Sequence, residues 1–121
     1  MSETYRVLVT GSRDWEDEES VRFEIVGMTM LHPGLVVVHG ACPSGADAMA
    51  AKACADIGIR QEPHPADWAG YGRVADPRRN AEMVALGADA CLAFIRNGSR
   101  GATHCADLAE KAGIPVMRLT A

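Results

Sequence analysis

Short apolar runs alternate along this chain with longer segments of helical periodicity, and this alternation restricts the possible folds more than any other feature. The apolar runs cover residues 5–10, 35–39, 59–64, 89–95 and 116–119. The helices predicted between them cover about 17–31, 44–57, 77–86 and 102–112, and residues 65–77 are expected to form a loop. Strands that alternate with helices form right-handed β-α-β units. The sequence therefore predicts a three-layer, Rossmann-like α/β fold, in which a five-stranded parallel sheet of order 3-2-1-4-5 carries helices on both faces.

The size and composition of the chain are those of an ordinary globular domain. Its 121 residues suit one domain and no linker or repeat divides them, so residues 1–121 are predicted to form a single unit. The formal net charge of −4 argues against binding to duplex nucleic acid. No apolar run approaches the roughly 20 residues that a membrane-spanning helix needs, so no membrane partner is expected.

Cysteine and histidine spacing bears on location and on metal binding. The four cysteines form no C-x-x-C pair, and no signal-peptide pattern precedes the first strand. Free thiols in a reducing compartment are the simplest interpretation, so a cytoplasmic protein is expected. The four histidines lack the spacing of metal ligands, and neither a metal nor a cofactor is expected.

A ligand site is expected in the loops that follow the strands, because sheets of this kind bind ligands beyond the carboxyl ends of their strands. The first loop contains Gly11, Ser12 and Arg13. Glycine lets the backbone approach a ligand closely, and the planar guanidinium group can hold a phosphate with two donors. A tight turn with a surface arginine explains this loop, taken alone, equally well.

The second loop, residues 40–47, opens a helix with a pattern suited to anion binding. Gly40 is followed by Ser44, Gly45 and Asp47, so backbone N–H groups at the positive end of the helix would face an anion. The pattern is neither G-x-G-x-x-G nor a Walker motif. A simple N-cap by Ser44 is the alternative.

Arginines gather in the third loop, and glycines and hydroxyls return in the fourth. Arg73, Arg78 and Arg79 fall within one stretch of seven residues, although the chain as a whole has a negative net charge. A bound anion is the counter-charge that we expect for them, with neighbouring carboxylates as the alternative. The other candidate ligand-binding residues in these loops are Asp67, Trp68, Asn80, Gly98, Ser99, Gly101 and Thr103. Two anion-binding loops at one sheet edge, with arginines between them, predict a phosphate clamp.

Taken together, these loops resemble the YspA-like branch of the SLOG superfamily. The resemblance rests on GSRDW at 11–15, HGACPSGAD at 39–47, PADW at 65–68, RNAEM at 79–83 and GSRG at 98–101, and it covers nearly the whole chain. The superfamily is named for the DNA-processing protein A and the Lonely Guy phosphoribohydrolases. The resemblance implies a Rossmannoid fold, an association with nucleotides or nucleotide-derived signals, and an origin in bacteria or their phages.

The enzymes of that superfamily hydrolyse the N-glycosidic bond of nucleoside 5′-monophosphates. Their pattern pairs an arginine, in a stretch similar to R-K-A-E-M, with a glutamate inside P-G-G-x-G-T-x-x-E. In this chain Arg79 falls on the arginine, whereas Cys105 stands at the glutamate position. A neutral thiol stabilises an oxocarbenium-like transition state poorly, so whether this protein is an enzyme stays open. Arg79 and Glu82 are the candidate catalytic residues, and Asp47 or Asp67 are alternatives for the missing carboxylate.

The expected function is therefore the binding of a phosphate-bearing nucleotide or nucleotide-derived small molecule at the carboxyl edge of the sheet. The protein would act as a sensor, a binding module or a hydrolase of undefined substrate. An active nucleoside 5′-monophosphate phosphoribohydrolase is the main alternative, and a single-stranded DNA-binding protein is a third. The relatives are commonly oligomeric, so a homo-oligomer is also expected, and Trp15, Trp68 and Phe94 could serve an interface or a ligand.

Overall fold

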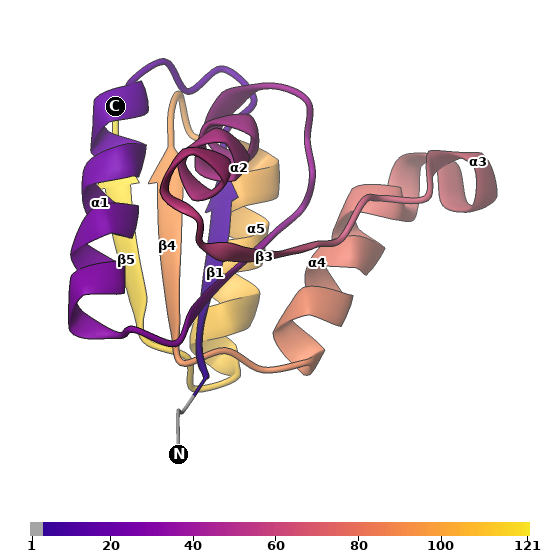
Figure 1. The fold of residues 1–121 in the computed structure, drawn as a ribbon. Coiled ribbons are helices and arrows are strands. Elements are labelled where there is room, and N and C mark those ends of the chain that lie inside the picture. The colour runs from indigo at the N-terminus through magenta and orange to yellow at the C-terminus, as the bar shows by residue number, and fades with distance from the viewer. Residues whose placement is uncertain (1–3) are drawn as a thin grey trace.

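A computed structural model describes residues 4–121 and shows a five-stranded parallel sheet with helices on both faces (Figure 1). The strands are β1 (Tyr5–Gly11), β2 (Leu35–His39), β3 (Arg60–Pro63), β4 (Ala90–Ile95) and β5 (Val116–Thr120). Their order in the sheet is β3-β2-β1-β4-β5. The predicted fold class and strand order are thus confirmed. The predicted domain span of 1–121 includes residues 1–3, which lie outside the described residues.

The central strands are apolar because both of their faces are covered. Leu8 of β1 lies opposite Val38 of β2, and both pack with the side chains of one helical layer. Val7 and Val9, the neighbours of Leu8 in β1, point to the other face and join the second part of the core. A strand that is buried on both faces has no polar side, which explains the continuous apolar run in β2.

Each face of the sheet is covered by two main helices. The first layer contains α1 (Glu18–Leu31) and α2 (Gly45–Ile57), whose apolar side chains pack on Val7, Val9 and Phe94. The second layer contains α4 (Ala75–Ala85) and α5 (Arg100–Lys111), which reach the sheet through Met83 and Cys105. Figure 1 shows α1 and α2 on one side of the sheet and α5 on the other.

The segment predicted as a loop at 65–77 contains additional helical structure, so that expectation was wrong. A short helix, α3 (Trp68–Tyr71), is followed by a 3-10 turn, η1 (Gly72–Val74), and by α4, which begins two residues before Pro77. Asp67 caps α3 by accepting a 2.9 Å hydrogen bond from the Gly70 N–H. Pro77 is tolerated in the first turn of α4 because an N–H group there has no partner within the helix.

Two further findings concern the described part of the chain alone. No helix within residues 4–121 combines the length and the apolar character needed to cross a bilayer. Over the same residues, no three His, Cys, Asp or Glu side chains gather in a group that could hold a metal ion.

Candidate functional site

A pocket of about 450 Å³ opens at the carboxyl edge of the sheet, on loops from four parts of the chain. The strand order reverses between β1 and β4, and this reversal separates the loops that follow them and creates a crevice. The lining consists of Val9, Thr10 and Gly11 at the end of β1 with Arg13 and Asp14 after it; Gly40, Cys42 and Asp47 after β2; Trp68, Asp76, Arg79, Asn80 and Met83 from α3 and α4; and Arg96, Asn97, Ser99, Gly101 and Ala102 after β4.

Gly45 allows the first two loops to lie directly against each other. It has a φ of +69°, and a Cβ atom there would lie 2.2 Å from the Ser12 carbonyl oxygen. The Ala46 N–H group donates a 3.3 Å hydrogen bond to that same oxygen. The Ser12 hydroxyl is buried and accepts a 2.7 Å hydrogen bond from the Arg96 N–H. Ser12 and Gly45 thus join the loops that surround the pocket and are absent from its lining.

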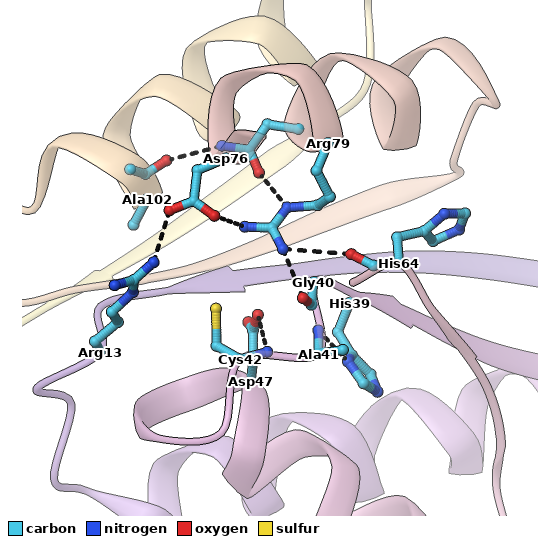
Figure 2. Close-up of polar contacts among 12 residues, drawn as sticks. Arg13, His39, Gly40, Ala41, Cys42, Asp47, His64, Asp76, Arg79 and Ala102 are labelled. Carbon is cyan, nitrogen blue, oxygen red and sulfur yellow. Dashed lines mark hydrogen bonds and ion pairs between the residues drawn. The ribbon is translucent and has the colours of Figure 1, made fainter. Parts of the chain in front are cut away.

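Arg79 is buried in the pocket wall and binds acceptors from three segments (Figure 2). Its Nη1 donates to the carbonyl oxygens of Gly40 and His64. Its Nη2 lies 3.0 Å from Asp76 Oδ1, and its Nε donates a 2.9 Å hydrogen bond to Asn80 Oδ1. One guanidinium group therefore holds the loops after β2 and β3 against α4.

Asp47 lies at the start of α2 and is only 5% exposed. Its Oδ2 atom accepts a long hydrogen bond, 3.5 Å, from the Cys42 N–H, as Figure 2 shows. Burial raises the pKa of the Asp47 carboxyl group, while the nearby His39 and Arg79 oppose that rise. A buried carboxyl group thus lies in the pocket near the cationic side chain of Arg79.

Arg13 and Arg96 bring two further guanidinium groups to the pocket. Arg13 Nη2 lies 2.7 Å from Asp76 Oδ2, and its guanidinium carbon lies 5.6 Å from the centre of the Trp68 ring. Arg96 Nη1 donates to the Asp14 carbonyl oxygen at 2.7 Å. The Arg13 side chain is 59% exposed, so it can turn toward a ligand at low cost.

The N-terminus of α5 forms another part of the pocket wall. Asn97 and Gly98 both have positive φ values, 52° and 62°, and they turn the chain from β4 into the helix. Ser99 is the N-cap residue, and its hydroxyl accepts a 3.5 Å hydrogen bond from the Ala102 N–H. The positive end of a 12-residue helix therefore borders the pocket through Ser99, Gly101 and Ala102.

The structure brings nine of the sequence-predicted site residues into the pocket lining. These nine are Gly11, Arg13, Gly40, Asp47, Trp68, Arg79, Asn80, Ser99 and Gly101. The other predicted residues, apart from Ser12 and Gly45, take different positions. Ser44 precedes α2 without a side-chain capping bond, Asp67 caps α3, Arg78 stacks on Tyr71 at 4.1 Å, Glu82 is exposed on α4, Gly98 lies in the turn before α5, and Thr103 lies half-buried within α5.

Cys105, which stands at the glutamate position of the enzymatic pattern, is fully buried between α5 and the sheet. Burial raises the pKa of its thiol, so the side chain stays neutral at ordinary pH. Sequence analysis missed three charged lining residues, Asp14, Asp76 and Arg96. Arg96 directly follows β4. Its position after a strand could have marked it as a candidate site residue, in the same way that the loop after the first strand marked Arg13.

Comparison with known proteins identifies the family. The model of the YspA, cpYpsA-related SLOG family matches residues 5–71. The Gene 61 protein of Mycobacterium phage D29 is 46% identical over 120 residues, which cover 93% of this chain and 94% of that protein. Among solved structures, the molybdenum cofactor carrier protein from Chlamydomonas reinhardtii shares the fold, with a TM-score of 0.69 at 17% identity over 98% of this chain and 79% of that one. Because the family model matches more than half of the described residues, this chain belongs to the YspA, cpYpsA-related SLOG family.

Proposed function

We propose that this protein binds a phosphate-bearing nucleotide or nucleotide-derived small molecule in the pocket, as a sensor or binding module. The observation that carries the proposal is the convergence of Arg13, Arg79 and Arg96 with the N-terminus of α5 on one pocket. Guanidinium groups and helix N-termini are the two protein elements best suited to a phosphate group. The volume of about 450 Å³ lies within the usual range for small-molecule sites.

The family and the structural neighbour agree with a small ligand. The neighbour is named as a carrier of the molybdenum cofactor, which is itself a small molecule. The four free cysteines are consistent with a reducing environment, and we propose a cytoplasmic location on that basis. A homo-oligomeric state stays a prediction.

Hydrolysis of an N-glycosidic bond is the second candidate function, and Asp47 is the observation that favours it. Glycosidic cleavage needs a carboxyl group beside the scissile bond. Cys105 lies in the core, and Glu82 is exposed and absent from the lining, whereas Asp47 lines the pocket beside Arg79. If the protein is a phosphoribohydrolase, we therefore infer that Asp47 of α2 supplies the carboxyl group in place of Glu82 or Cys105.

Calorimetric titration with AMP, GMP, CMP, UMP, adenosine and inorganic phosphate tests the binding proposal. Arg13→Gln should weaken monophosphate binding about tenfold, because a charge-assisted hydrogen bond contributes about 1.5–3 kcal/mol. Arg22→Gln is the matched control, since Arg22 pairs with Asp56 on the helical layer of α1 and α2 and is absent from the lining. Equal affinity for adenosine and AMP, or equal losses in both variants, would contradict the proposal. Chromatography of the same mixtures for free base tests the hydrolase candidate.

A further inference from the structure

Asp47 has a carboxyl oxygen that no other described group satisfies. Oδ1 is buried and lacks a hydrogen-bond partner within residues 4–121. Oδ2 accepts a long hydrogen bond, 3.5 Å, from the Cys42 N–H. A buried polar atom without a partner costs free energy comparable to a lost hydrogen bond, and folded proteins rarely retain one without a reason.

The cationic neighbour of Asp47 is already committed to other acceptors. Arg79 donates to Gly40, His64, Asp76 and Asn80, and no ion pair between Arg79 and Asp47 occurs in the described part of the chain. Gly40 lies between the two side chains, where a Cβ atom would fall 2.4 Å from Arg79 Nη1 and 2.9 Å from Asp47 Oδ2. Because Gly40 has no Cβ atom, both side chains fit against the pocket wall, and Asp47 is one of the lining residues. The hydrogen bonds that its carboxyl group lacks are therefore ones that a ligand in the pocket can supply.

The chemistry of the ligand group that meets Asp47 follows from charge. A carboxylate repels phosphate, so the phosphate must lie nearer to Arg13 and the N-terminus of α5, which also line the pocket. The part of the ligand at Asp47 must instead donate hydrogen bonds. Every ribonucleotide carries neutral donors on its sugar, whereas exocyclic amino groups occur only on some bases. Two adjacent hydroxyls can donate to the two oxygens of one carboxylate.

We propose that Asp47 accepts hydrogen bonds from the 2′- and 3′-hydroxyls of the ligand's sugar and makes the pocket selective for ribose phosphates over deoxyribose phosphates. This inference rests on the proposed binding function. It assigns Asp47 as a specificity-determining residue of the same pocket, whichever base the ligand carries. Sites built to hold a hydroxyl group reject the analogue that lacks it, because their polar groups are then left unpaired.

The test compares the affinities of AMP, 2′-deoxy-AMP, 3′-deoxy-AMP and 2′,3′-dideoxy-AMP for the wild-type protein and two variants. The wild type should bind AMP at least about fivefold more tightly than either monodeoxy analogue. Of the four ligands, it should bind the dideoxy analogue most weakly. Asp47→Ala should bring these affinities close together by weakening AMP. Asp56→Asn is the control, because it removes the charge of a carboxylate that pairs with Arg22 outside the pocket lining and should keep the preference for ribose.

The outcomes separate this inference from the proposed function. If AMP binds through Arg13 but the deoxy analogues bind equally well, or if the ribose preference survives in Asp47→Ala, the inference is overturned and the binding function stands. If no monophosphate binds more tightly than adenosine, the binding function itself fails. The melting temperature of ligand-free Asp47→Ala should stay close to that of the wild type, because the substitution removes the unpartnered Oδ1 together with one long hydrogen bond from the Cys42 N–H to Oδ2. A lower value would show a structural role and would also count against the inference.

Discussion

Arg13 Nη2 lies 2.7 Å from Asp76 Oδ2, and this ion pair ties the loop after β1 to α4 beside the pocket. The other oxygen of the same carboxylate lies 3.0 Å from Arg79 Nη2. Figure 2 shows Asp76 between the two guanidinium groups. One carboxylate therefore pairs with two of the three guanidinium groups in the pocket and competes with any anion that enters it.

Removal of the Asp76 charge should therefore strengthen anion binding. Asp76→Asn keeps an oxygen for Arg79 and frees Arg13, whose exposed pair contributes about 0–1 kcal/mol, so the affinity for AMP should rise about three- to fivefold. Asp107→Asn is the control, because it breaks a similar pair with Arg118 that does not line the pocket. Calorimetric titration measures the AMP affinity of both variants. Weaker AMP binding by Asp76→Asn would count against a phosphate near Arg13.

Arg79→Ala should lower both stability and affinity, whereas Arg100→Ala should change neither by much. Loss of the Arg79 guanidinium leaves four acceptors without a donor, and we expect the free energy of unfolding to fall by about 2–4 kcal/mol. AMP binding should weaken more than tenfold because the pocket loses one guanidinium group and the loop at Gly40 loses its support. Arg100 is exposed at the start of α5, and surface substitutions of that kind stay within about 0.5 kcal/mol. Urea unfolding measures the stability of both variants, and titration with AMP at a temperature where both are folded measures their affinity. Similar losses in Arg79→Ala and Arg100→Ala would contradict the role assigned to Arg79.

Two glycines with similar backbone angles should respond very differently to alanine. Gly45 and Gly58 have φ values of +69° and +83°, so both substitutions carry the backbone cost of about 1–2 kcal/mol. A Cβ atom at Gly58 meets no atom within 4 Å, whereas one at Gly45 meets the backbone of Ser12 and Arg13. Gly45→Ala should therefore be the more destabilising variant by at least about 2 kcal/mol, as measured by urea unfolding. Equal unfolding midpoints would show that the first two loops separate without cost.

Stability in acid should depend on Glu62. Hydrogen bonds with Arg6, the larger contribution, and with His64 lower the pKa of this carboxyl group to about 2. A lowered carboxyl pKa contributes stability above the unfolded value of about 4.3 and loses it as the pH falls toward the folded value. The side chain is 35% exposed, so screening limits the contribution to about 1 kcal/mol.

Glu62→Gln should therefore be less stable than the wild type at pH 5.5, and most of that difference should disappear by pH 3. Urea unfolding at half-unit steps of pH measures the effect. The same substitution made in an Arg6→Gln background is the control and should show a smaller dependence on pH. A difference that grows as the pH falls would contradict the assigned direction of the pKa shift.

The sequence by itself determined the architecture of this protein and the edge at which its pocket lies. The alternation of apolar runs with helical segments is a local pattern, and parallel strands joined by right-handed connections leave few other topologies. Residues 65–77 were the exception, because a helix of four residues is too short for periodicity to reveal. It begins at a capping hydrogen bond that the Gly70 N–H donates to Asp67.

Only the tertiary structure decided what each polar side chain in that pocket does. Arg78 and Arg79 are adjacent in the sequence, yet one stacks on an exposed tyrosine and the other is buried among four acceptors. One residue along a helix turns the side chain by about 100°, so the contacts depend on how α4 is placed against the sheet. The pairing of Arg13 with Asp76 and the unsatisfied oxygen of Asp47 arise in the same way, from segments that are distant in the sequence and meet only because the strand order brings their loops together.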